Sequence, residues 1–164
     1  MIDVLLTEHA FREYGDRLLQ AGVPTRLLRL QGDGGLVVDG APSDTAAEPE
    51  VAWLTAEAFY DGVVVTFFDA VAAAPSLRWL HSPAAGVDLP FFAGLSERGV
   101  RVTTSHVNAI PIAEYVLAVV LSHYQQLGRW RDAQSARAWR HHEFREVHDT
   151  TWLVVGLGAI GSAV

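Results

Sequence analysis

The sequence contains no cysteine, and all twelve of its basic residues are arginine. The absence of cysteine excludes disulfide bonds, thiolate metal sites and a cysteine nucleophile. The absence of lysine excludes a Schiff-base lysine and the lysine of a phosphate-binding P-loop within these residues. Several covalent and metal-dependent mechanisms are therefore removed before any motif is considered.

Basic charge is scarce as well, because the arginines stand against 19 acidic residues and the formal net charge is -7. A nucleic-acid surface needs a basic face that displaces counterions, so we expect no nucleic-acid partner. No apolar run reaches the roughly 20 residues that cross a bilayer. Residues 1–6, with an acid at Asp3, are typical of a strand and not of a signal peptide. We therefore expect a cytoplasmic protein without a membrane partner.

Apolar residues make up 50% of the chain, which is enough for a packed core. We expect five strands, over residues 2–6, 25–30, 51–55, 77–81 and 100–103, with helices over residues 8–20, 62–73 and 88–98. Strands separated by helical stretches of about 10 to 15 residues predict an α/β fold with a parallel sheet covered on both faces. The predicted architecture is a flavodoxin-like doubly wound parallel sheet.

Two stretches refine this prediction. Arg26 and Arg29 interrupt the apolar pattern of residues 25–30, which favours a place near an edge of the sheet. Residues 31–50 are rich in glycine and proline, and we expect a surface excursion there that includes a small hairpin.

The loop of residues 82–88 (Ser-Pro-Ala-Ala-Gly-Val-Asp) follows the fourth expected strand. Its small side chains leave backbone N–H groups accessible, and a set of such donors at a helix start suits a carboxylate or a phosphate. Asp88 is placed to cap the next helix, with Pro90 in its first turn. Thr55 is the last residue of the third expected strand, at the carboxyl edge where ligands of such sheets bind. The alternative is an ordinary turn between a strand and a helix.

Residues 108–115 (Asn-Ala-Ile-Pro-Ile-Ala-Glu-Tyr) begin a helix that we expect to reach Gln126 and Leu127. Pro111 suits the first helical position. Beyond Tyr115 the helix is apolar nearly all round, so it needs cover on several sides. A place between two domains or at a subunit interface provides this cover, and the alternative is a core helix of a single domain.

Residues 128–150 combine arginine, tryptophan and acidic residues in nearly balanced charge. This composition predicts an amphipathic connector in which Trp130 and Trp139 are packing anchors. The sequence His141-His142-Glu143 lacks the His-Glu-x-x-His spacing of zinc peptidases, so we expect no metal site.

Residues 151–155 are apolar and rich in β-branched side chains, and they lead into Gly156-Leu157-Gly158-Ala159-Ile160-Gly161. This pattern predicts a buried parallel strand that turns into a helix, with glycines that let the backbone approach a pyrophosphate. We expect the strand to be covered by the preceding helix or by a second copy of the chain. The residue that selects NAD or NADP would follow about 20 residues further on.

Taken in this order, residues 82–88, 108–115 and 156–161 resemble the D-isomer-specific 2-hydroxyacid dehydrogenase family, and in particular its glyoxylate and hydroxypyruvate reductase branch. The resemblance implies that the chain is the amino-terminal part of an NAD(P)-dependent reductase of small 2-oxo acids.

The resemblance also implies a domain organisation. Residues 1–104 would be the flavodoxin-like substrate domain. Residues 105–150 would be a crossing helix and connector that contribute to a homodimer. Residues 151–164 would be the first strand and turn of a truncated Rossmann domain.

For the site, the resemblance implies that the amides of Ala85 and Gly86 hold the substrate carboxylate and that Thr55 and Gln126 line the cleft. The residues implied at the cofactor pyrophosphate are Gly156, Gly158, Ala159, Ile160 and Gly161. The family's catalytic arginine, glutamate and histidine belong to the nucleotide-binding half, so no catalytic residue is assigned here. We expect these 164 residues alone to be inactive and not to bind the cofactor. The alternative is a stand-alone noncatalytic module that binds a carboxylate or self-associates.

Overall fold

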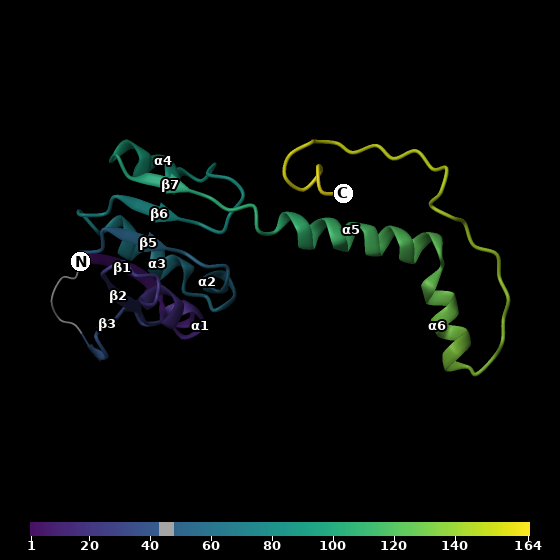
Figure 1. Ribbon diagram of the computed structural model, residues 1–164, viewed down its shortest axis with the longest axis horizontal. Coiled ribbons are helices and arrows are strands. Elements are labelled where there is room, and N and C mark those ends of the chain that lie inside the picture. Colours follow the sequence, from purple (N-terminus) through teal and green to yellow (C-terminus); the bar gives the residue numbers. More distant parts are fainter. Residues whose placement is uncertain (43–47) are drawn as a thin grey trace. The chain divides into compact units, whose positions relative to one another are not determined.

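A computed structural model of the chain describes residues 1–42 and 48–164, which form two compact units, Met1–Ser105 and His106–Val164 (Figure 1). The strands of the first unit are β1 (Ile2–Thr7), β2 (Thr25–Leu30), β3 (Leu36–Val38), β4 (Ala41–Pro42), β5 (Val51–Trp53), β6 (Trp79–His81) and β7 (Arg101–Thr103). Its helices are α1 (Glu8–Leu19), α2 (Glu57–Tyr60), α3 (Val64–Ala72) and α4 (Pro90–Glu97).

The seven strands form one sheet in the order β4-β3-β2-β1-β5-β6-β7. Each neighbouring pair among β2, β1, β5, β6 and β7 is parallel. If only these five strands are numbered along the chain, their order is 2-1-3-4-5, which is the flavodoxin-like order. The predicted fold class is confirmed.

The predicted hairpin is present, since β3 and β4 pair with each other and β3 pairs with β2, all antiparallel. The rest of the turn-rich stretch is described only in part, because residues 43–47 lie outside the described residues. β2 lies near an edge of the sheet, as expected, but the hairpin makes it the third strand from that edge. The β2 arginines form ion pairs, Arg26 with Asp3 and Arg29 with Glu8, the latter at 3.5 Å.

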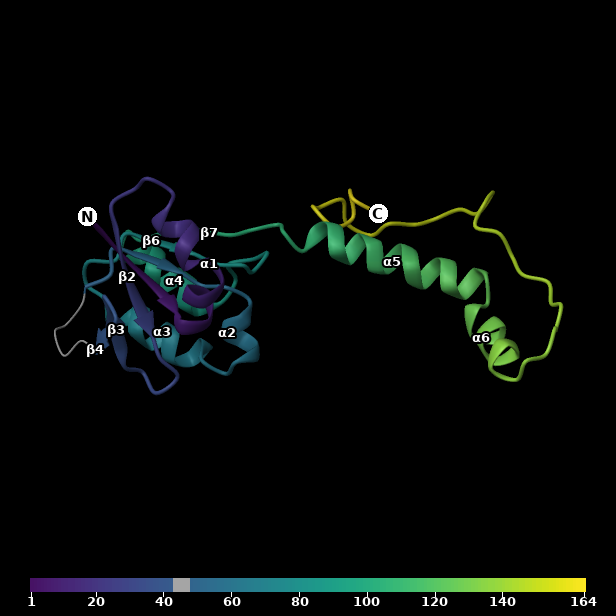
Figure 2. The ribbon, with the colours of Figure 1, turned by 60° about the horizontal axis from the view of Figure 1, so that its bottom comes forward.

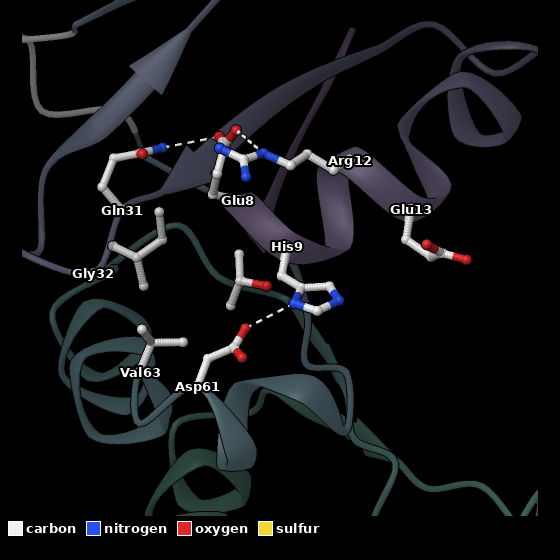
Figure 3. Close-up of a pocket in the computed structure, with 10 residues that line it drawn as sticks. Glu8, His9, Arg12, Glu13, Gln31, Gly32, Asp61 and Val63 are labelled. Atoms are coloured by element: carbon white, nitrogen blue, oxygen red, sulfur yellow. Dashed lines mark hydrogen bonds and ion pairs between the residues drawn. The ribbon is translucent and has the colours of Figure 1, made fainter.

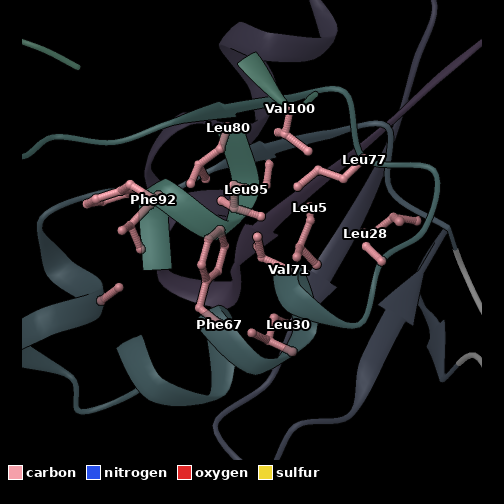
Figure 4. Packing of buried hydrophobic residues seen from close by; sticks show 14 residues of the cluster. Leu5, Leu28, Leu30, Phe67, Val71, Leu77, Leu80, Phe92, Leu95 and Val100 are labelled. Atoms are coloured by element: carbon pink, nitrogen blue, oxygen red, sulfur yellow. The ribbon is translucent and has the colours of Figure 1, made fainter. Parts of the chain in front are cut away.

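The core lies on both faces of this sheet. Leu5 belongs to a cluster that α3 and α4 cover with Phe67, Val71 and Leu95 (Figure 4). Leu6 belongs to a second cluster, on the opposite face, to which α1 contributes Ala10. Helix α1 is drawn in purple beside β1 in Figure 2. Successive side chains of a strand face opposite sides, so a strand buried on both faces has a continuous apolar run.

Helix α4 begins at Pro90, and Leu89 before it makes no side-chain cap bond. The capping role predicted for Asp88 is therefore wrong. Proline at the first helical position lacks the N–H that would otherwise need a partner, which makes a side-chain cap less necessary. The Asp88 carboxylate lies near Gly86, where an added Cβ would come within 3.2 Å of Oδ2.

The second unit contains α5 (Ala109–Tyr124) and α6 (Leu127–Ser135). Pro111 is the third residue of α5 and not the first, a position at which a helix also has no acceptor for the missing N–H. The expected continuous helix ends earlier than predicted, because Gln126 has a left-handed backbone with φ of 53°. None of the helices in the described residues is long and apolar enough to span a membrane.

The two tryptophans predicted as anchors differ. The Trp130 ring lies 4.0 Å from the His142 ring, and its Nε1 donates to the Gln125 carbonyl at 2.8 Å. Trp139 is 94% exposed, so its predicted role as an anchor is wrong. The sequence pattern does not distinguish these two tryptophans. They differ in the structure because Trp130 lies within α6, whereas Trp139 lies outside any helix.

The strand predicted over residues 151–155 is absent, and residues 136–164, all of them described, form no helix or strand. The expected cover is absent too, since Leu153 is 88% and Val155 is 90% exposed. A strand satisfies its backbone groups by pairing with a neighbour. The described second unit holds no other strand with which this run could pair.

Candidate functional site

The first candidate site lies at the carboxyl edge of the sheet, where β5, β6 and β7 end together. His81 is in register with Trp53 on one side and Thr103 on the other. The Leu54 N–H donates to the His81 carbonyl and the Ser82 N–H donates to the Thr103 carbonyl, both at 2.9 Å. Thr55 and the loop of residues 82–88 therefore follow adjacent strands at one edge.

The beginning of this loop is fixed, and its middle is open. Ser82 is fully buried, and its hydroxyl accepts a hydrogen bond from the Ala84 N–H at 3.2 Å. Ala85 and Gly86 are exposed. In the part of the chain that the structure describes, neither of their N–H groups donates to a protein acceptor. Such free, adjacent donors suit an anionic ligand.

The strands beneath the loop are joined by polar side chains. Thr103 Oγ1 accepts from Trp79 Nε1 at 2.8 Å and lies 2.9 Å from His81 Nδ1. These contacts hold the end of β6 against β7 just before the loop begins. His81 therefore has a structural partner at the site.

Thr55 is 6% exposed, and its hydroxyl has no hydrogen-bond partner among the described residues. Most buried polar groups in proteins are paired, so an unpaired hydroxyl needs an explanation. Gln126 differs, since its Nε2 donates to the Glu143 carbonyl at 3.2 Å and its Oε1 accepts from Arg129 at 2.7 Å. Gln126 is thus engaged within the second unit, and its substrate role stays a prediction.

In the glycine-rich turn two positions require glycine, although both the strand before the turn and the helix after it are absent. Gly156 has φ of 95°, a region that favours glycine. A Cβ at Gly161 would clash with the Gly156 carbonyl oxygen, so no side chain fits there. A Cβ added at Gly158 would meet no heavy atom within 4 Å. The Ser162 N–H donates to the Gly158 carbonyl at 2.9 Å, which closes one helical turn. The contact of this turn with a cofactor pyrophosphate stays a prediction.

A separate cavity of about 360 Å³ lies where β1 and β2 end (Figure 3). Glu8 accepts hydrogen bonds from Gln31 and Arg12, both at 3.0 Å, and His9 lies 2.8 Å from Asp61. The bond from Gln31 is the main cause that lowers the pKa of Glu8. These side chains are already paired with one another. No sequence pattern indicates them, because His9 and Asp61 are 52 residues apart.

Metal-binding side chains are not gathered anywhere in the described residues. No group of three or more histidine, aspartate or glutamate side chains there could hold a metal ion. His142, which belongs to the His-His-Glu sequence, lies against the Trp130 ring, with the two rings tilted by 37°.

No family model and no curated protein matches the sequence. Solved structures do match. A D-isomer-specific 2-hydroxyacid dehydrogenase family protein from Aeromonas salmonicida subsp. salmonicida A449 is 25% identical, with a TM-score of 0.66 over 99% of this chain and 48% of that one. D-lactate dehydrogenase from Aquifex aeolicus, complexed with NAD and lactic acid, is 20% identical, with a TM-score of 0.62 over 98% and 46%.

The NADPH-dependent glyoxylate/hydroxypyruvate reductase from Sinorhizobium meliloti, in complex with NADP and malonate, is 18% identical, with a TM-score of 0.62 over 99% and 48%. The matched structures include a D-lactate dehydrogenase and a glyoxylate/hydroxypyruvate reductase. The resemblance to the reductase branch therefore stays a prediction. The chain spans about half the length of each matched protein. The resemblance carried by the three motifs is confirmed: the chain has, along nearly its whole length, the fold of the amino-terminal part of D-isomer-specific 2-hydroxyacid dehydrogenases.

Proposed function

We propose that the chain is the amino-terminal part of an NAD(P)-dependent 2-hydroxyacid dehydrogenase. The observation that carries the proposal is the pair of free amides at Ala85 and Gly86, at the carboxyl edge of a sheet with this family's fold. In the reaction, a 2-oxo acid, NAD(P)H and a proton give the 2-hydroxy acid and NAD(P)⁺. Residues 1–104 are the substrate domain in this proposal, and residues 105–150 connect it to the nucleotide domain.

The substrate is a small 2-oxo acid held by its carboxylate. Two adjacent N–H groups match two carboxylate oxygens, and Thr55 lies at the end of the neighbouring strand. The matched proteins act on lactate and on glyoxylate or hydroxypyruvate. Pyruvate and hydroxypyruvate share the 2-oxo carboxylate and differ by one hydroxyl on C3.

The cofactor is NAD or NADP, which supplies the hydride when bound. Its pyrophosphate would lie against the backbone of Gly156, Gly158, Ala159, Ile160 and Gly161. The space at Gly158 and the absence of room for a side chain at Gly161 support this assignment. We assign no residue of this chain to the family's catalytic arginine, glutamate and histidine. The 164 residues alone are therefore proposed to be inactive and not to retain the cofactor.

A homodimer in the cytoplasm is the proposed state of the whole protein. Helix α5 exposes large apolar side chains, among them Tyr115 at 70% and Leu121 at 49%. Exposed apolar surface of this kind marks an interaction surface. Light scattering on the full-length protein tests this state, and a monomer at micromolar concentration would contradict it.

Steady-state kinetics of the full-length protein test the function, with NAD(P)H and glyoxylate, hydroxypyruvate or pyruvate. We expect turnover by the full-length protein and none by the 164-residue chain. Gly86→Val is expected to raise KM about 10-fold or more, because its side chain crowds Asp88 and the amide donors. Gly94→Ala in α4 is the matched control, because its added methyl meets open space. Equal KM values for wild type and Gly86→Val would contradict the carboxylate site.

A stand-alone carboxylate-binding module is the second candidate. The observation that favours it is that the first unit forms a complete sheet with its own core. Titration calorimetry of the 164-residue chain with oxalate separates the two proposals. Micromolar binding together with no reductase activity of the full-length protein would favour the module.

A further inference from the structure

A hydroxyl of β7 joins two side chains of β6 directly before the loop of residues 82–88. Thr103 is in register with His81 in the parallel pair of β6 and β7. Its Oγ1 accepts from Trp79 Nε1 at 2.8 Å and lies 2.9 Å from His81 Nδ1. The Thr103 carbonyl also accepts from the Ser82 N–H at 2.9 Å. Thr103 therefore holds the start of the loop through both its backbone and its side chain.

The three joined side chains lie on one face of the sheet. Successive residues of a strand point to opposite sides, so Trp79 and His81 share the face that Leu80 does not. Leu80 and its neighbour Val102 pack in the core cluster covered by α3 and α4. Trp79 is 43% exposed on the other face. The apolar core thus joins β6 and β7 on one side, and the Thr103 hydroxyl joins them on the other.

The direction of these hydrogen bonds follows from the donors that are present. An indole nitrogen can only donate, so Thr103 Oγ1 is the acceptor of the bond from Trp79. The hydrogen of the Thr103 hydroxyl is then available to His81 Nδ1. A neutral imidazole accepts at this nitrogen when its Nε2 carries the proton. The distances fit a chain of donors that runs from Trp79 through Thr103 to His81.

We propose that Thr103 is a positioning residue that, through this chain, holds the loop of residues 82–88 ready for the substrate carboxylate. The Ala85 and Gly86 amides donate to no protein acceptor among the described residues, so their direction depends on where the loop begins. A loop held in place before the ligand arrives loses less conformational freedom on binding. Thr103 does not contact the substrate and acts through the residues that precede the loop. This inference rests on the proposed function.

Steady-state kinetics of the full-length protein, with NAD(P)H and glyoxylate, hydroxypyruvate or pyruvate, test the role of Thr103. Thr103→Val keeps the shape of the side chain, which suits a strand, and removes the hydroxyl. A contact made equally in the ground state and the transition state affects KM and leaves kcat unchanged. We therefore expect this variant to raise KM for the 2-oxo acid about 10-fold and to keep kcat within about 2-fold. Thr103→Ser retains the hydroxyl and should keep both values within about 2-fold of the wild type.

Thr104→Val provides the matched control. Thr104 is the next residue, and its hydroxyl takes part in none of the hydrogen bonds formed within the described residues. This variant is expected to leave KM and kcat unchanged. An equal rise in KM in both valine variants would overturn the proposal, because it would reflect a general disturbance at the end of β7.

The tautomer of His81 supplies a readout that does not depend on activity. Heteronuclear NMR of the 164-residue chain, labelled at histidine, distinguishes a protonated ring nitrogen from an unprotonated one. His81→Gln identifies the His81 signals. At about pH 8, where an ordinary imidazole is neutral, we expect an unprotonated Nδ1 in the wild type and a mixture of tautomers in Thr103→Val. A protonated Nδ1 in the wild type would overturn the proposed chain.

The failure of this inference can be told apart from the failure of the proposed function. Absence of reductase activity in the full-length protein would refute the proposed function. An active enzyme whose KM is unchanged by Thr103→Val would refute only the role of Thr103.

Discussion

The first and second units contain similar apolar runs with different outcomes. Leu5 and Leu6 in β1 are at most 1% exposed, whereas Leu153 and Val155 are at least 88% exposed. Both runs are typical of a buried parallel strand. The first has β2 and β5 on its two sides, and the second has no strand beside it in the described second unit. An apolar run therefore specifies a strand only where the fold provides partners.

The helix starts of the two units differ in the same way. Thr7 caps α1 through a hydrogen bond from the Ala10 N–H, while Asn108 before α5 makes no side-chain cap bond. Both residue types are good caps. The comparison of the units can be tested at the backbone, in the core, at the caps and in the response to pH.

Hydrogen exchange is expected to show the largest difference. The β1 amides bond within the sheet and should exchange only through extensive unfolding. The amides of residues 152–155 should exchange roughly a thousand-fold faster or more. The measurement is exchange of the 164-residue chain followed by mass spectrometry. Similar protection of the amides in β1 and in residues 152–155 would contradict the contrast between the two units.

Core truncation should give the next largest effect. Phe67 in α3 is fully buried, and Phe67→Ala is expected to lower the free energy of unfolding by about 3–5 kcal/mol. Leu121 in α5 is 49% exposed, and Leu121→Ala should cost less than about 1 kcal/mol. Urea unfolding followed by circular dichroism measures both. A similar loss at the two positions would show that α5 is covered in solution.

Removal of the cap should have a smaller effect. Thr7→Ala is expected to lower the free energy of unfolding by about 1 kcal/mol, because the Ala10 N–H loses its partner. Asn108→Ala removes no cap bond and should change stability by less than about 0.5 kcal/mol. Thr7→Ser keeps the bond and serves as the control. A larger loss from Asn108→Ala than from Thr7→Ala would contradict the contrast.

The smallest effect concerns pH. The Gln31 hydrogen bond is the main cause that lowers the pKa of Glu8 below its ordinary value of 4.5. A carboxyl whose folded pKa is lowered stabilises the fold above its unfolded pKa, and this contribution is lost as pH falls through the folded pKa. The Tm of the wild type should therefore fall as the pH falls below the ordinary pKa of 4.5. Gln31→Ala should show a smaller fall in Tm over the same pH range. Gln20→Ala, which removes an exposed amide, is the control. An identical pH profile for wild type and Gln31→Ala would contradict the assignment.

Much of the first unit could be predicted because local sequence patterns indicate its helices and strands. The range of β2 matches the prediction, and β1, α1 and α3 match it to within about two residues. The exact place of β2 in the sheet could not be predicted. It depends on β3, which pairs with β2, and on β4, which pairs with β3, and these few residues form strands only through that pairing.

The candidate site was predictable to a similar extent. The loop with Ala85 and Gly86 and the glycine turn with Gly156 and Gly161 are visible as motifs, since small residues at fixed spacings reflect backbone geometry. The unpaired hydroxyl of Thr55 is not visible, because the sequence does not say which buried groups lack partners. The missing Asp88 cap shows the same limit on a local scale, where Pro90 set the helix start instead.

The sequence by itself determined which segments of the first unit are strands and helices, their order along the chain, and the motifs that identify the family's fold. Periodicity, caps and glycine positions are local properties, and they act before distant contacts form. Only the tertiary structure decided which strands became neighbours, which apolar runs were buried and which buried hydroxyl stayed unpaired. Those outcomes depend on hydrogen bonds and contacts between residues far apart in the chain, where each group is satisfied only if a partner is present.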